Sequence, residues 1–272
     1  MIRVSRLFVY PVKSCAGTEV QTARVTATGF AWDRRWMVVG EDSGFLSQRR
    51  HPRLALVRTR LGDGRLVLSA PGLSEVSVEL EREPGPSVRV VVWRDECDAL
   101  DEGRAAAEWL SAHLGVTARL VRLVDDDARP LATAAAQPGD RVSFADAYPF
   151  LLVSEASLDE LNRRLALPVP MDRFRPNIVV AGCAQHAEDG WLQVRMGDVD
   201  FRVVKACARC VVITTDQATG VRGPEPLRTL TSYRLRDGEV LFGQNLIHGH
   251  LGAVSVGDPV IVLASEQRDE WS

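Results

Sequence analysis

Two cysteines three positions apart lie in the segment 201–216, which reads FRVVKACARCVVITTD. Cys207 and Cys210 stand beside Lys205 and Arg209. A thiolate close to cationic side chains has a lowered pKa and becomes a better nucleophile or metal ligand. The β-branched residues around the pair predict a largely buried strand over the whole segment. This strand either carries chemistry or contributes only to the core.

A Cys-x-x-Cys pair permits several interpretations. A zinc site needs two more ligands, and His248 and His250 are candidates because both would face one side of a strand. A thioredoxin-like redox pair needs the motif at the start of a helix, whereas poor helix formers follow Cys210. On a continuous strand, side chains three apart point to opposite faces, so Cys207 and Cys210 would not hold one metal together. Two other interpretations remain. One of the cysteines is a soft thiolate ligand or a nucleophile, or both cysteines are buried and inert.

Three further segments carry polar side chains near expected strands. Lys13 and Ser14 follow a proline, and an ammonium, a hydroxyl and backbone donors in a loop are typical of an anion site, although a solvated lysine is the plainer interpretation. Arg34 lies beside a strand, where a surface salt bridge is the usual outcome. Arg175 and Asn177 precede an apolar strand as turn formers or as ligand donors. The sequence contains no glycine-rich phosphate loop, no dinucleotide fingerprint and no His-Glu-x-x-His motif.

The composition is that of a soluble globular protein, with 46% apolar and 25% charged residues in a chain of 272. The net charge of -3 gives no reason to expect nucleic acid or an anionic membrane as a partner. No apolar run approaches the ~20 residues that a membrane helix needs. Five cysteines do not suggest a disulfide framework, and the first residues read as a strand rather than a signal peptide. We therefore expect a cytoplasmic protein with reduced thiols.

Short strands dominate the secondary structure expected for the first half. They are expected over 2–9, 35–39, 45–48, 54–61, 65–69, 75–80 and 88–93, with a hairpin turn at 62–64. Helical spacing predicts a helix over 101–115 that Asp101 caps and Gly115 ends. The polar stretch 125–141 contains two prolines and is either a domain boundary or a surface loop.

The second half is expected to combine helices with strands. Residues 157–160 match a capping box and predict the start of a helix, which Pro168 and Pro170 would end. Besides the strand over 201–216, strands are expected over 177–181, 192–196, 199–204, 239–244, 248–254 and 259–263.

Taken together, these segments resemble the MOSC family, the molybdenum cofactor sulfurase C-terminal domain proteins, and in particular the branch of the mitochondrial amidoxime-reducing component and its bacterial relatives. The matching motifs follow the family's order over nearly the full length: YPVKSC at 10–15, DR at 33–34, SEASL at 154–158, FRPNIV at 174–179, ACARC at 206–210, TGV at 219–221, EPL at 225–227, SYR at 232–234, FGQ at 242–244 and VGDPV at 256–260. The resemblance implies a strand-rich α+β fold, with an N-terminal β-rich, barrel-like domain over 1–124. A β-barrel MOSC domain with a few helices would follow over 125–272.

The resemblance also implies a molybdenum cofactor, a pterin with a dithiolene and a phosphate, whose metal takes one cysteine thiolate from the protein. By its position in ACARC that ligand is Cys210, which agrees with the interpretation of one soft thiolate. The residues implied to hold the cofactor are Lys13, Ser14, Arg34, Asp146, Ala147, Tyr148, Arg175 and Asn177, with Ala208 and Arg209 acting through the backbone. Animal members carry small hydroxyl residues where Ala147 and Tyr148 stand, so contacts at these two positions would come from the backbone.

The implied activity is the reduction of N-hydroxylated compounds, amidoximes and hydroxylamines, by oxygen-atom removal at a Cys-ligated molybdenum. Electrons would come from a separate donor (a ferredoxin, a haem protein or a flavin reductase). The sequence has no cysteine cluster after Gln244 and no flavin or nicotinamide fingerprint. The alternative is a non-catalytic sulfur carrier or cofactor-binding module in which Cys210 holds a persulfide.

Overall fold

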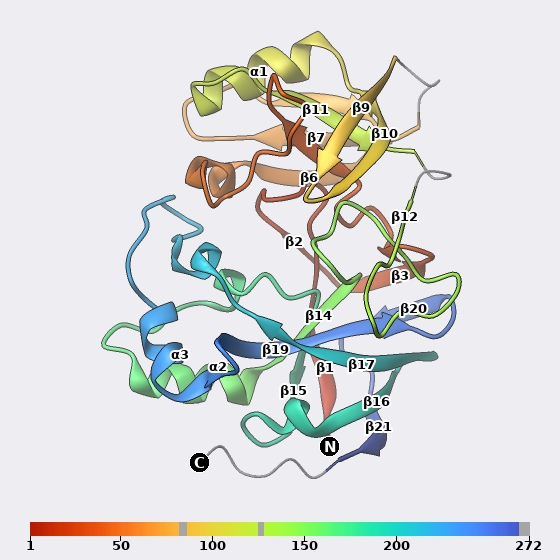
Figure 1. Ribbon diagram of the computed structural model, residues 1–272, viewed down its shortest axis with the longest axis vertical. Helices are drawn as coiled ribbons and strands as arrows, with labels where there is room; N and C mark the ends of the chain where they lie inside the picture. The colour runs from red at the N-terminus through yellow and green to blue at the C-terminus, as the bar shows by residue number, and fades with distance from the viewer. Residues whose placement is uncertain (82–85, 125–127, 267–272) are drawn as a thin grey trace.

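Strands outnumber helices in the computed structural model, which describes residues 1–81, 86–124 and 128–266 (Figure 1). The α-helices in this part of the chain are α1 (Arg104–Leu114), α2 (Glu155–Arg164) and α3 (Leu227–Arg234). The strand-rich α+β fold expected from the sequence is therefore confirmed.

The largest sheet joins the two ends of the sequence. Its strands are β1 (Arg3–Val9), β2 (Thr18–Val20), β14 (Phe150–Ser154), β15 (Ile178–Ala181), β16 (Trp191–Met196), β17 (Val199–Ala208), β18 (Leu235–Arg236), β19 (Glu239–His248) and β21 (Val260–Ser265). They follow the order β2-β1-β15-β14-β19-β17-β16-β21, with β18 paired to β19. Every pair is antiparallel except β14 with β15. Strand β1 thus forms hydrogen bonds with a strand that begins at residue 178.

Two smaller sheets accompany the large one. They are formed by β20 (Gly252–Ser255), β3 (Thr22–Thr26) and β4 (Gly29–Phe30), and by β12 (Arg129–Pro130) with β13 (Arg141–Val142). We call β1–β4, β12–β21, α2 and α3 the large lobe. The pairing of β3 with β20 and of β1 with β15 crosses residue 124, and the domain boundary expected there stays a prediction. Residues 125–127, at the start of the loop expected over 125–141, lie outside the described residues.

Residues 36–123 form the small lobe, the orange and yellow part of Figure 1, with α1 at its outer end. Its strands are β5 (Trp36–Val39), β6 (Arg58–Gly62), β7 (Arg65–Ser69), β8 (Val76–Glu79), β9 (Ser87–Val92), β10 (Asp95–Asp101) and β11 (Arg119–Leu123). They form the sheets β5-β11-β10-β9 and β6-β7-β8. Ala106 and Leu110 of α1 pack with Leu66, Leu68 and Leu120 in the core of this lobe, which Val12 and Cys15 also join.

Among the elements expected in the first half, two strands and one cap differ from the structure. The strand expected over 45–48 is wrong, because Phe45 makes only an isolated bridge with Val39. The strand expected over 54–61 is wrong at its start, because residues 54–56 belong to a 3₁₀ helix over 52–56 that opens on a proline, and only β6 is extended. Helix α1 begins after Gly103 without a side-chain cap, although Asp101 accepts a 2.7 Å hydrogen bond from the Gly103 amide. Gly115 ends the helix in the left-handed region, as expected.

Among the elements expected in the second half, α2, β17 and β19 differ from the structure. Helix α2 is capped by Ser154, whose Oγ accepts a 3.1 Å hydrogen bond from the Ser157 amide, so the helix starts before residue 157. The continuous strand expected over 201–216 is wrong beyond Ala208, because residues 211–214 form a 3₁₀ turn. The strand expected over 248–254 is divided, with β19 ending at residue 248 and β20 beginning at 252.

Candidate functional site

A cavity of about 460 Å³ lies where the two lobes meet. The large lobe lines it with loop residues around 146 and 175 and with the end of β17, and the small lobe adds Phe45, Arg49 and Trp93. All eleven site residues expected from the sequence line this cavity: Lys13, Ser14, Arg34, Asp146, Ala147, Tyr148, Arg175, Asn177, Ala208, Arg209 and Cys210. The fold therefore brings together residues separated by almost 200 positions.

The cavity is strongly cationic although the whole chain has a net charge of -3. Six cationic side chains line it against one carboxylate, Asp146; the cations are Lys13, Arg34, Arg49, Arg175, Lys205 and Arg209. Such a lining attracts anions.

Two of these arginines share one aromatic ring. The guanidinium carbons of Arg34 and Arg175 each lie 4.4 Å from the centroid of the Tyr10 ring, which is buried. The Tyr10 hydroxyl donates to the Pro176 carbonyl, so the ring is fixed at both of its ends. Arg175 donates through Nη1 to the Cys15 carbonyl at 2.6 Å. Its other nitrogens form no hydrogen bond with the described residues, which leaves their donors for a ligand. Tyr10 thus holds two guanidinium groups in place without consuming their hydrogen bonds.

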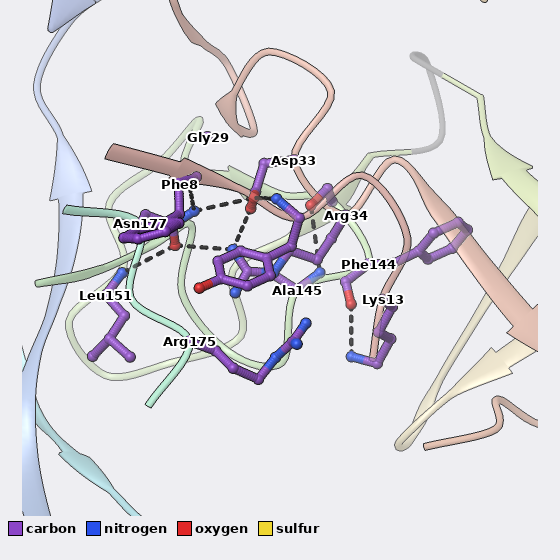
Figure 2. Close-up of polar contacts among 12 residues, drawn as sticks. Phe8, Lys13, Gly29, Asp33, Arg34, Phe144, Ala145, Leu151, Arg175 and Asn177 are labelled. Carbon is purple, nitrogen blue, oxygen red and sulfur yellow. Dashed lines mark hydrogen bonds and ion pairs between the residues drawn. The ribbon is translucent and has the colours of Figure 1, made fainter. Parts of the chain in front are cut away.

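Asn177 is the hub that holds Arg34, as Figure 2 shows. Its Oδ1 accepts from Arg34 Nη1 at 2.9 Å and from the Leu151 amide at 3.3 Å. Its Nδ2 donates to the Phe8 carbonyl at 3.2 Å and to Asp33 Oδ1 at 3.1 Å. Both donor and both acceptor positions of the amide are therefore occupied by the protein. Asn177 lines the cavity, but its side chain acts by positioning Arg34.

Lys13 and Asp146 form an ion pair at another side of the cavity. The Lys13 ammonium is buried, and it donates to the Phe144 carbonyl at 2.6 Å (Figure 2). It also donates to the Asp146 carboxylate. Desolvation lowers the pKa of Lys13, although Asp146 acts against this shift. Desolvation would raise the pKa of Asp146, but the charge and hydrogen bond of Lys13 outweigh it and lower that pKa to about 2. Asp146 is therefore an anion at neutral pH.

Cys210 lies just beyond the end of β17 and precedes the 3₁₀ turn over 211–214. Its thiol is partly exposed, and Nη2 of Arg49 lies 3.6 Å from Sγ. Cys207 belongs to β17 and packs against the large-lobe core, where Arg209 Nη1 donates to its sulfur at 3.0 Å. The two cysteines therefore differ in environment because only Cys207 lies on the strand, and not because one strand alternates its faces.

Backbone strain is concentrated around the cavity. In the part of the chain that the structure describes, nine residues other than glycine have a positive φ, and four of them line the cavity: Ser14, Arg34, Trp93 and Arg175. Each such residue costs of order 1–3 kcal/mol, and such residues cluster at functional sites. This strain is independent support for the cavity as the functional site.

The sequence did not predict that residues of the small lobe line the cavity. Phe45, Arg49 and Trp93 come from a polar loop and from the tip of the β9–β10 hairpin. The available signal was Trp93 itself, a large aromatic residue in a two-residue hairpin loop where small or polar residues are usual.

Two other expectations concern metals and membranes. Within residues 1–81, 86–124 and 128–266, no three His, Cys, Asp or Glu side chains are grouped to hold a metal, so His248 and His250 do not complete a zinc site with the two cysteines. None of the helices in those residues combines the length and the apolar character needed to cross a membrane.

Comparison with known families gives the class of the protein. Residues 1–117 match the MOSC N-terminal beta barrel domain, and residues 139–261 match the MOSC domain. The chain therefore belongs to the MOSC family. Within the second match lie eight of the eleven expected site residues; Lys13, Ser14 and Arg34 lie in the first.

Curated relatives narrow the comparison. The chain is 38% identical to mitochondrial amidoxime-reducing component 1 of Mus musculus, over 96% of this chain and 82% of the relative. It is 37% identical to mitochondrial amidoxime-reducing component 1 of Homo sapiens, over 96% of this chain and 82% of that relative. Among solved structures, the YuaD protein from Bacillus subtilis covers 96% of this chain at 9% identity and a TM-score of 0.41, a likeness that carries no argument about function.

Proposed function

We propose that this protein reduces N-hydroxylated compounds, amidoximes and hydroxylamines, with a molybdenum cofactor bound in the cavity between the lobes. The observation that carries the proposal is the gathering of one partly exposed cysteine and six cationic side chains around a single cavity. Relatives named amidoxime-reducing components match nearly the whole chain, which supports this substrate class.

The residues present fit such a cofactor. A pterin phosphate needs cationic donors, and Arg34 and Arg175 offer guanidinium nitrogens beyond those already bonded to the protein. Each charge-assisted hydrogen bond would contribute roughly 1.5–3 kcal/mol. The Nε atom of Arg209 is buried and has no hydrogen-bond partner among the described residues, so a ligand could satisfy this donor. Cys210 offers one soft thiolate, the ligand type that suits a metal already bound by sulfur.

When bound, the cofactor supplies the two-electron redox chemistry that cleavage of an N–O bond requires. The chain's own residues bind and orient. Cys210 would hold the metal, Lys13, Ser14, Arg34 and Arg175 would hold the pterin and its phosphate, and Ala208 and Arg209 would contact it through the backbone. Asp146 is ionised at neutral pH and would accept a hydrogen bond from an N–H or O–H group.

Reduction also needs electrons from outside the chain. We propose a separate donor of the ferredoxin, haem-protein or flavin-reductase kind. The cytoplasmic location expected from the sequence stays a prediction.

The test is expression with molybdate, elemental analysis, and an assay with an amidoxime and an artificial electron donor. The wild type is expected to contain stoichiometric molybdenum and to produce the amidine. Cys210→Ser should keep the thermal unfolding midpoint of the wild type and lose the activity. Cys183→Ser, at a partly exposed cysteine that does not line the cavity, is the matched control and should retain activity.

Two outcomes would overturn the proposal. Reductase activity in Cys210→Ser at the wild-type level would exclude Cys210 as the metal ligand. A persulfide on Cys210 in a protein without molybdenum would favour the sulfur-carrier alternative.

A further inference from the structure

The tip of the β9–β10 hairpin carries an aromatic residue in an unusual backbone conformation. Val92 pairs with Asp95, so the loop contains two residues, and the first of them, Trp93, has a φ of 59°. Glycine dominates this loop position because side chains disfavour a positive φ. A tryptophan held there, 41% exposed and lining the cavity, points to a role for its ring.

The orientation of this ring is fixed without a ligand. The ring of Phe45 meets it at a centroid distance of 4.8 Å and an angle of 61°. The indole Nε1 donates to Asp146 Oδ1 at 3.3 Å. The indole is thereby tied both to the small lobe and to the acidic residue of the cavity.

Arg49 lies over the same ring. Its guanidinium carbon is 4.5 Å from the centroid of Trp93, and its Nη2 is 3.6 Å from Cys210 Sγ. A guanidinium group is a planar, Y-shaped arrangement of nitrogens around one carbon, and this shape stacks well on an indole. An amidoxime head and its amidine product have the same planar arrangement around one carbon. A simple hydroxylamine, with a pyramidal nitrogen, does not.

The Arg49 side chain is free to leave this position. It is exposed and forms no ion pair with any described residue, whereas its backbone is held, since Arg222 donates to the Arg49 carbonyl at 3.2 Å. Displacing the side chain would therefore break only the stacking on Trp93 and the contact with the sulfur.

We propose that the face of the Trp93 indole is the binding platform for the planar head of an amidoxime or amidine, and that Arg49 occupies this platform until a ligand displaces it. The inference rests on the proposed function and deepens it, because it assigns substrate selection to two residues of the small lobe. A head group in the place of Arg49 lies beside Cys210, where the chemistry is proposed to occur. Planar amidoximes are then preferred to alkylhydroxylamines.

The test uses the cofactor-loaded protein and two readouts. Calorimetry measures the Kd of acetamidine, and steady-state kinetics measure KM and kcat for acetamidoxime and for N-ethylhydroxylamine, which differ mainly in the planar head. A lost stacking contact of about 1–2 kcal/mol predicts that Trp93→Leu raises the acetamidine Kd and the acetamidoxime KM roughly 5- to 30-fold. The KM for N-ethylhydroxylamine should not change. Trp93→Phe, which keeps a smaller ring, should show an intermediate loss.

Removing the intramolecular occupant should act in the opposite direction. Arg49→Ala is expected to lower the acetamidine Kd and the acetamidoxime KM a few fold. The matched controls are Arg50→Ala, at the neighbouring exposed arginine, and Trp109→Leu, at a tryptophan of α1; neither lines the cavity, and neither should change any of the constants.

Failure of this inference differs from failure of the proposed function. A wild type that reduces neither substrate contradicts the proposed function, while the acetamidine Kd still tests the platform. Equal Kd values in the wild type and in Trp93→Leu would overturn the platform, as would an equal rise in KM for both substrates. Weaker acetamidine binding in Arg49→Ala would show that Arg49 assists the ligand and does not compete with it.

Discussion

Replacing Asn177 with leucine removes the amide that links β1, β14 and the Arg34 loop. Four hydrogen bonds disappear, to the Phe8 carbonyl, the Leu151 amide, Asp33 and Arg34, all at a side chain that is 1% exposed. The substitution therefore tests whether Asn177 stabilises the folded protein in addition to positioning Arg34.

The magnitude follows from the partners left behind. In the variant, Arg34 still donates to Asp33 at 2.5 Å, and the Tyr10 amide still donates to Asp33 at 2.8 Å. The Phe8 carbonyl and the Leu151 amide each lose a buried partner, at about 1–3 kcal/mol per group. Burial of the leucine methyl groups offsets part of this destabilisation, so the free energy of unfolding falls by about 2–4 kcal/mol. Because whole domains have stabilities of about 5–15 kcal/mol, this loss is easily measured.

The assay is urea unfolding of the cofactor-free protein, followed by circular dichroism, with the midpoint and slope fitted separately. Asn245→Leu is the matched control, because Asn245 also lines the cavity but makes no side-chain hydrogen bond with any described residue. It should change stability by less than about 0.5 kcal/mol. A loss below about 1 kcal/mol in Asn177→Leu, or equal losses in both variants, would refute the reasoning.

Two further predictions concern pH. The ion pair with Lys13 lowers the pKa of Asp146 to about 2, against a usual value of 3.8. Between these two pH values the native state binds fewer protons than the unfolded state, so the native state loses stability as the pH falls through this range. Asp146→Asn should flatten the pH dependence of the urea midpoint between about pH 4 and pH 2; an unchanged slope would contradict the ion pair as its cause. At Glu188, burial raises the pKa above 4.5, so the native state keeps a proton that the unfolded chain releases, and stability falls as pH rises from 4.5. Glu188→Gln should remove that fall in urea titrations up to neutral pH, whereas the same fall in both proteins would exclude Glu188 as its source.

The cavity could be assembled from the sequence only through the family resemblance. Lys13, Arg34, Arg175 and Cys210 come from separate segments, and nothing in their spacing indicates that β1 pairs with β15. The contribution of Trp93 could not be found in this way, because none of the motifs that carry the resemblance includes it. Its neighbours in space, Arg49 and Asp146, lie more than 40 positions away.

Local patterns failed where a distant partner decides the structure. Ser157 was expected near the start of α2, but Ser154 caps the helix. Oxygens of the buried Glu188 carboxyl group accept hydrogen bonds from the Ser154 amide and from the hydroxyls of Ser154 and Ser157, and so hold both serines in place. After β17 the β-branched residues favour continued strand, yet Cys210 begins a turn in which the Ile213 amide donates to its carbonyl at 3.2 Å. Arg173 Nη1 donates to the Ile213 carbonyl in this turn at 3.4 Å, so a contact with a residue distant in sequence acts against propensity at both places.

The position of β1 has a consequence for synthesis on the ribosome. Its contacts with β15 span 174 positions between Ser5 and Val179. At about 5–20 residues per second, the first strand emerges roughly 10–30 s before the segment that completes its pairing. During this interval Val4, Leu7 and Val9 lack most of their final neighbours, so the nascent chain is a natural client for chaperones that shield hydrophobic segments.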